Sequence, residues 1–158
     1  MSGEATLDVR GQSYHNAWRS QAHNIWQSQI HNSKLKNILV TEMSDSILRN
    51  KSKEFAKDTV LLCRIIRQNG VEGALINQLL RCGTSVGANI HEAQYAQGTK
   101  DFISKLEIAL KECNESEYWL ELLYETNSLS KMEFDNFQKK CIELRRMLVS
   151  SVTTLKNK

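Results

Sequence analysis

The sequence predicts an all-α protein built as an antiparallel four-helix bundle, and two observations carry this prediction. From about residue 50 onward, apolar residues recur at three-, four- and seven-residue steps, which is the spacing of one buried helix face. The 158 residues contain no Pro, so no residue of that kind interrupts long helices. Helical segments joined by short connections favour antiparallel neighbours in a bundle. A chain of this length suits one domain with its own core.

The chain divides into an N-terminal extension over residues 1–48 and the expected bundle over residues 49–158. The extension carries an eight-residue repeat, in which residues 15–22 return as residues 23–30 and a third copy begins at His31. Eight residues advance about 800° on a helix, so repeated positions drift and form no straight face. We expect a tail or a partly ordered segment. The alternative is that Trp18 and Trp26 stack on nucleic-acid bases or pack on a partner.

The first two helices are expected over residues 51–68 and 72–96. The first has Ser52 near its start, carries Phe55, Leu62 and Ile66 on one side, and stops at Asn69-Gly70. The second stops at Gly98.

The third and fourth helices have clearer start signals. Thr99 is the expected N-cap of the third helix, whose apolar positions are Phe102, Leu106, Ala109, Cys113 and Leu120. Ser130 and Glu133 form an expected capping box that opens the fourth helix. Its inward positions are Phe134, Phe137, Cys141, Leu144, Leu148 and Leu155.

The second helix carries a polar stripe beside its apolar one. The polar stripe contains Arg81, Ser85, Asn89 and Glu92, and the apolar stripe contains Leu79, Val86, Ile90 and Ala93. Solvated helix faces usually collect Lys and Glu freely, so this sparser stripe is expected to hold helix packing or a subunit interface.

Two glycines, Gly83 and Gly87, lie four residues apart on the same helix. Each costs a helix interior about 1 kcal/mol relative to Ala, which suggests that close packing or assembly offsets the cost. We therefore expect a neighbouring helix, or a second subunit, to approach closely there. The alternative is a local kink.

Charge is unevenly shared among the helices. Residues 99–126 have a net charge of −4, residues 131–158 of +4 and residues 51–68 of +3. If the first and fourth helices lie side by side, their cations can form one positive surface that contacts phosphates. The residues expected on it are Lys57, Arg64, Arg67, Lys139, Lys140, Arg145 and Arg146. The alternative is that these are ordinary solvated faces, paired in part with the acidic third helix.

Other classes of protein are disfavoured. Cys63, Cys82, Cys113 and Cys141 are widely spaced and fit small core residues, one in each helix, better than a metal site or disulfides. The sequence suggests no phosphate-binding loop and no Ser-His-Asp or Cys-His set, so we expect no enzyme, no cofactor and no metal. No apolar run is long enough to span a membrane and no secretory signal is evident, which predicts a cytoplasmic protein.

The second helix also resembles a known family. The pattern Leu-x-Arg-x-x-x-Ser-x-x-x-Asn-Ile-x-Glu over residues 79–92, followed by Asp101-Phe102, Leu106, Ala109, Glu112 and Glu115, resembles the four-helix-bundle proteins encoded within intervening sequences of bacterial 23S ribosomal RNA. The resemblance covers residues 50–156. This chain departs from the family in having Ala93 where a Gly is common, and in its N-terminal extension.

The resemblance has implications beyond the bundle. The family is similar in fold to the accessory variability determinant of diversity-generating retroelements, a basic pentameric barrel that binds RNA and a reverse transcriptase. A homo-oligomeric ring, a pentamer by resemblance, is thereby implied here, with RNA and a reverse transcriptase as partners.

The expected function is that of a non-catalytic RNA-associated accessory protein that uses basic helix surfaces. The alternatives are a protein-interaction scaffold for a polymerase or reverse transcriptase, and a purely structural oligomer.

Overall fold

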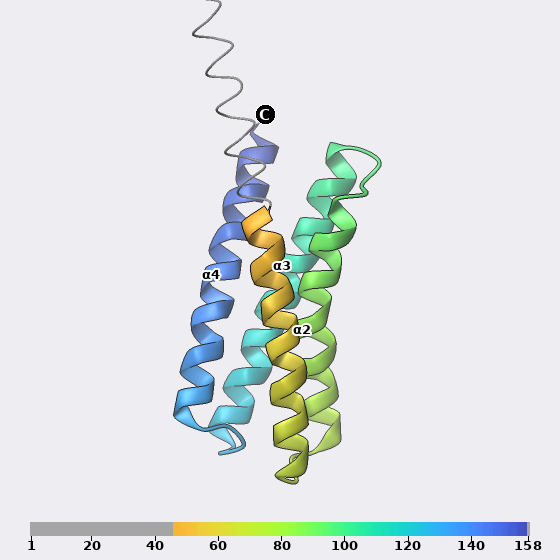
Figure 1. Cartoon of the computed structure of the whole chain (residues 1–158). Coiled ribbons are helices and arrows are strands. Elements are labelled where there is room, and N and C mark those ends of the chain that lie inside the picture. The colour runs from red at the N-terminus through yellow and green to blue at the C-terminus, as the bar shows by residue number, and fades with distance from the viewer. Residues whose placement is uncertain (1–45, 158) are drawn as a thin grey trace, which may run out of the picture. The chain divides into compact units, whose positions relative to one another are not determined.

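A computed structural model describes residues 46–157, and over this range the chain forms four helices and no strand (Figure 1). The first helix spans residues 46–68 and is called helix 46–68 below. It is followed by α2 (Gly73–Ala93), α3 (Thr99–Glu125) and α4 (Lys131–Lys156). Connections of four or five residues make successive helices antiparallel. The all-helical prediction is confirmed, and none of the described helices is long and apolar enough to cross a membrane.

Each helix packs on two others, so that the four surround one core (Figure 1). α2 packs on α3, and α3 packs on α4. Helix 46–68 closes the bundle by contacting α2, where Gly83 faces Thr59, and α4, where the Phe55 and Phe137 rings meet edge to face at 6.0 Å. The first and fourth helices therefore do lie side by side, as the charge analysis assumed.

The buried residues follow the predicted helical spacing. From the expected core, the structure buries Phe55, Leu62, Ile66, Leu79, Val86, Ile90, Ala93, Leu106, Ala109, Leu120, Phe137, Leu144 and Leu148. Phe102, Phe134 and Leu155 are only partly buried and pack against the edge of this core.

The four cysteines are buried core residues, one from each helix, as predicted. Burial raises the pKa of the Cys63 and Cys82 thiols to about 11. The neighbouring Cys113 thiol and burial raise the pKa of Cys141. The Cys63, Cys82 and Cys141 thiols are thus held in the protonated form, which is the unreactive one at neutral pH.

Local signals explain where the helices end. Helix 46–68 ends in a Schellman motif, because Gly70 has φ 83° and the amides of Gly70 and Val71 bond back to the carbonyls of Arg67 and Ile66. α3 ends in the same motif with Asn127 at φ 57°, a signal that the sequence analysis missed. The predicted capping box of Ser130 and Glu133 opens α4.

Two predicted helix starts were wrong. Gly98 is the N-cap of α3, and Thr99 is already its first helical residue. Ser52 lies inside helix 46–68, where its hydroxyl donates to the Arg49 carbonyl at 2.9 Å, because this helix includes residues 46–50. α2 ends at Ala93, three residues short of its expected end.

Helix 46–68 approaches α2 closely at the two glycines. A methyl group on Gly83 would lie 2.7 Å from Thr59 Cγ2 and 2.9 Å from Thr59 Oγ1, well inside van der Waals contact. A methyl group on Gly87 would lie 3.2 Å from the Ser52 carbonyl oxygen. Thr59 is fully buried and its hydroxyl donates to the Phe55 carbonyl at 2.9 Å, so it has little room to move.

Gly83→Ala is expected to destabilise the protein by up to about 2 kcal/mol, because overpacking costs about 1–3 kcal/mol and the gain in helix propensity offsets only about 1 kcal/mol of it. Thr59→Ala removes both crowding atoms. The double variant is therefore expected to lose less free energy of unfolding than the sum of the losses of the two single variants. Denaturant unfolding of all four proteins measures this coupling.

Gly73→Ala is the matched control, since a methyl group there meets no atom within 4 Å, and it is expected to be neutral or stabilising. Strict additivity of the Gly83 and Thr59 changes would contradict the close approach.

Candidate nucleic-acid interface

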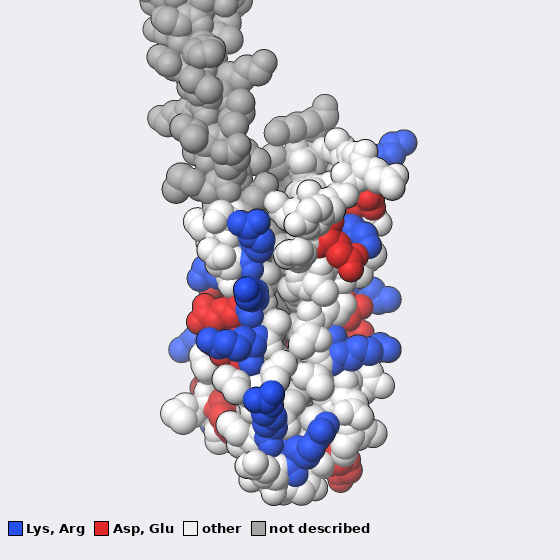
Figure 2. Space-filling model, turned by 45° about the vertical axis from the view of Figure 1, so that its right-hand side comes forward, with Lys and Arg blue, Asp and Glu red and all other residues white. Residues whose placement is uncertain are grey.

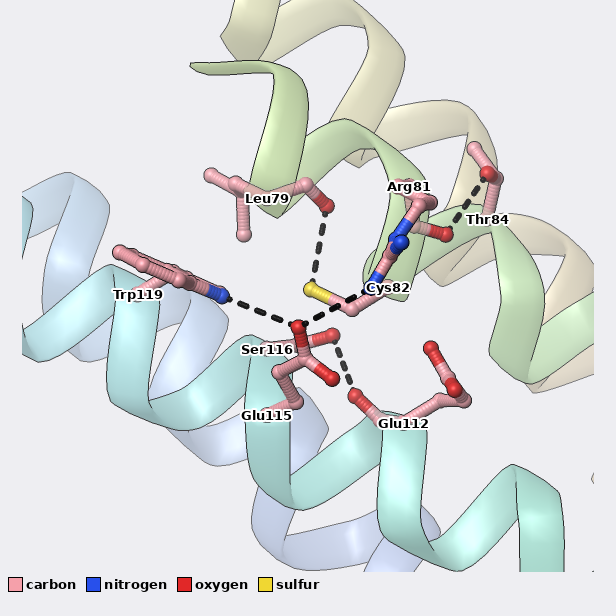
Figure 3. Close-up of polar contacts among 8 residues, drawn as sticks. All are labelled: Leu79, Arg81, Cys82, Thr84, Glu112, Glu115, Ser116 and Trp119. Atoms are coloured by element: carbon pink, nitrogen blue, oxygen red, sulfur yellow. Dashed lines mark hydrogen bonds and ion pairs between the residues drawn. The ribbon is translucent and has the colours of Figure 1, made fainter. Parts of the chain in front are cut away.

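The polar stripe of α2 lies along the seam between α2 and α3. At one end, Arg81 forms an ion pair with Glu115 at 3.8 Å, and at the other, Glu92 pairs with Lys105 at 2.6 Å (Figure 3 shows the first pair). The Arg81 and Glu92 side chains are 71% and 57% exposed, so neither is buried within one chain. These two residues link α2 to α3 from the surface.

The middle of the stripe is more enclosed. Ser85 and Asn89 are half-buried, and the Asn89 side-chain amide donates to the Ser85 carbonyl at 2.9 Å and to the Ser85 hydroxyl at 3.1 Å. These bonds stay within α2. The described contacts therefore involve the stripe in the packing of α2 on α3 at its two ends, while its role in a subunit interface stays a prediction.

A polar cluster surrounds the Arg81 end of this seam. Figure 3 shows Arg81 and the Trp119 indole both directed at Glu115, and Trp119 Nε1 donates to Glu115 at 3.3 Å. Behind them, the Cys82 thiol donates to the Leu79 carbonyl and the Ser116 hydroxyl to the Glu112 carbonyl. Because each group in the cluster has a partner, we interpret it as a packing feature of the seam.

Two of the cations predicted to contact phosphates are engaged in ion pairs within the bundle. Lys140 reaches across to Asp58 on helix 46–68, and Arg145 pairs with Glu117 on α3. Both cations are partly buried, and they leave α4 on opposite sides. The expectation that they belong to one open positive surface with the first helix is therefore not met by this geometry.

The seam between helix 46–68 and α4 is of mixed charge. Besides the Lys140–Asp58 pair, Lys51 pairs with Glu143 at 2.9 Å. Lys139 and Arg146 are exposed, seven residues apart on one outer side of α4, and have no carboxylate partner among the described residues. The mixed seam separates these two from the cations of the first helix.

The concentrated positive charge lies on helix 46–68 alone. We call it the basic stripe; it consists of Arg49, Lys53, Lys57, Arg64 and Arg67. Their spacing places all five within about 80° of one another around the helix axis. All are exposed, and none forms an ion pair with a described carboxylate. Figure 2 shows Lys and Arg side chains following one another down this side of the molecule, whereas both signs mix elsewhere on the same view.

Two hollows lie between the basic stripe and α2. One, of about 490 Å³, is lined by Arg49, Lys53 and Ala56 from the first helix and by Gly87, Ala88 and His91 from α2, among others. The other, also about 490 Å³, lies where Arg64 and Arg67 face Leu80. Small residues on the facing helices leave the first hollow open, so the same glycine ridge that brings the helices together produces a groove rimmed by cations.

Sequence reasoning included Lys57, Arg64 and Arg67 in the site and missed Arg49 and Lys53. Arg49 was missed because the first helix was expected to begin at residue 51. Lys53 was counted in the charge of the first helix but not placed on a face. The signal that identifies both is the common face shared by positions 49, 53, 57, 64 and 67 once the helix is extended to residue 46.

Other sites are not evident in the part of the chain that the structure describes. Residues 46–157 contain no group of three or more His, Cys, Asp or Glu side chains arranged to hold a metal ion. The repeat and its Trp18 and Trp26 lie outside the described residues.

Fold and site together define a four-helix bundle whose first helix carries a basic stripe beside two hollows. The family model of the 23S rRNA-intervening sequence protein matches residues 44–150, and the chain belongs to this family. Among solved structures, it is similar to a protein of unknown function from the S23 ribosomal protein family of Bacteroides thetaiotaomicron VPI-5482, with 42% identity and a TM-score of 0.68. That match covers 70% of this chain and 98% of the other. No curated protein matches.

Arg145→Ala is expected to destabilise the bundle by about 1–2 kcal/mol, since it leaves the poorly exposed Glu117 carboxylate without its cation. Arg64→Ala is the matched control and is expected to cost less than about 0.5 kcal/mol, because Arg64 is exposed and unpaired among described residues. Denaturant unfolding measures both. Equal costs would contradict the division into structural and free cations.

Proposed function

We propose that the protein is a non-catalytic RNA-associated accessory protein that binds the phosphate backbone of RNA along the basic stripe. The observation that carries this proposal is the set of five exposed cations on one helix face, without a described carboxylate partner. Cations already paired within a protein gain little from a phosphate, whereas unpaired ones release the counterions of the nucleic acid on binding.

The arrangement of the stripe suits a linear polyanion. Along helix 46–68 the stripe extends from Arg49 to Arg67, a length of about 27 Å at about 1.5 Å per residue. The long side chains of Lys and Arg rim a groove instead of a closed pocket. Contacts of this kind supply affinity and position without reading base sequence.

Membership in the 23S rRNA-intervening sequence family agrees with an RNA-associated role. We also propose that the bundle acts like the accessory variability determinant of diversity-generating retroelements, which the sequence analysis named as similar in fold to this family, and that a reverse transcriptase is a protein partner. A protein-interaction scaffold predicts a complex that survives nuclease and high salt, which separates it from binding through RNA.

We further propose a homo-oligomeric ring, a pentamer by the same resemblance. Ile47, Leu61 and Ile65 are each nearly half exposed and share one face of helix 46–68, about a quarter turn from the basic stripe. Burying this apolar face between subunits would leave the stripe open beside it. Repetition of the stripe in a ring would add avidity to a modest charge on each chain.

Changing Lys53, Lys57 and Arg64 together to Gln is expected to weaken RNA binding and to flatten its salt dependence. Loss of three phosphate contacts lowers the slope of log K against log salt by about 2 for a single strand. Fluorescence anisotropy with a labelled RNA over a salt series measures both quantities.

The matched control changes Lys100, Lys139 and Arg146 to Gln, which removes the same formal charge from exposed positions outside the stripe. It is expected to retain most of the affinity and slope. If the control variant loses as much RNA affinity and salt dependence as the stripe variant, binding depends on net charge alone and the stripe is not the site.

Leu61→Glu with Ile65→Glu is expected to reduce the mass of the oligomer while helical content is kept, because charges would enter the proposed apolar contact. Light scattering with circular dichroism tests this. An unchanged oligomer would exclude this face from the interface, and a monomeric parent protein would exclude the ring.

A further inference from the structure

We propose that Tyr95 and His91, at the end of the groove beside Arg49, form a base-stacking platform that makes the site selective for single-stranded RNA. This inference rests on the proposed function and adds the class of nucleic acid. It is carried by the position and exposure of two aromatic rings next to a hollow that cations line.

The two rings lie together on the surface at the end of α2. Their centroids are 5.6 Å apart and the ring planes are tilted by 44°. Tyr95 follows α2 and is 77% exposed, so most of this residue is open to solvent. An exposed aromatic ring contributes little to the stability of the fold, because it is not buried. It offers an apolar face on which a nucleobase can stack.

The rings are connected to the phosphate site through His91. This residue also lines the first hollow, opposite Arg49 and Lys53. A nucleotide whose phosphate contacts these cations therefore has the aromatic pair within reach of its base. The remaining cations, Lys57, Arg64 and Arg67, continue the phosphate path toward the other end of the helix.

This combination distinguishes single strands from duplexes. In a duplex, the bases are already stacked on one another and are turned away from the phosphates, so only the stripe can be used. In a single strand, a splayed base can stack on an aromatic side chain, which contributes about 1–3 kcal/mol for each base. The stripe alone would bind both forms through their phosphates.

The test compares the full chain with its Tyr95→Ala and Tyr95→Phe variants on two probes, an oligoadenylate of about 12 nucleotides and an RNA duplex of the same length. Tyr95→Ala is expected to weaken binding of the oligoadenylate by about five- to one-hundred-fold and to leave duplex binding within twofold. Tyr95→Phe keeps the ring and is expected to bind both probes like the parent. Circular dichroism and light scattering confirm that fold and mass are unchanged.

Two other outcomes separate this inference from the proposed function. If the Tyr95→Ala variant binds the oligoadenylate like the parent, or loses the same affinity for both probes, the proposed stacking platform is wrong. In that case the loss of both probes in the Lys53, Lys57 and Arg64 variant still supports the stripe. If that stripe variant binds both probes like the parent, the proposed RNA function itself fails, and the platform with it.

Discussion

The close approach of helix 46–68 to α2 at Gly83 is the constraint on which the rest of the structure depends. There, the glycine leaves room for the buried Thr59 side chain, and one turn later Gly87 meets the backbone at Ser52. Because the two helices lie this close, their apolar faces meet in one core. α3 and α4 contribute the other buried side chains of that core. The helix-propensity cost of the glycines, about 1 kcal/mol each, is offset by this packing.

The same close contact shapes the surface. Gly87 and Ala88 on the α2 side of the seam fill little of the space between the two helices, so the first hollow remains open there. Cations of the first helix line this hollow and the second one. At the other seams, by contrast, cations are matched with carboxylates, as in the Arg145–Glu117 and Lys140–Asp58 pairs. Charge that is balanced at those seams contributes to packing, whereas the unbalanced charge beside the groove is available to a polyanion.

Within the described residues, the four cysteine side chains are buried and the Glu115 carboxylate is partnered. Burial keeps the Cys63 and Cys82 thiols protonated at neutral pH, and Arg81 and Trp119 share the Glu115 carboxylate. The open groups are the cations of the stripe and the aromatic pair of His91 and Tyr95. These open groups are the ones that the proposed binding surface uses.

The sequence by itself determined the helical class, most of the core and several helix ends, because these depend on the spacing of apolar residues and on local signals such as Gly70 and the Ser130–Glu133 capping box. The pattern over residues 79–92 also indicated the 23S rRNA-intervening sequence protein family. Only the tertiary structure decided which cations are free. Lys140 and Arg64 look equivalent in the sequence, but whether a carboxylate lies opposite depends on the register between helices far apart in the chain, and helical periodicity carries no information about that register.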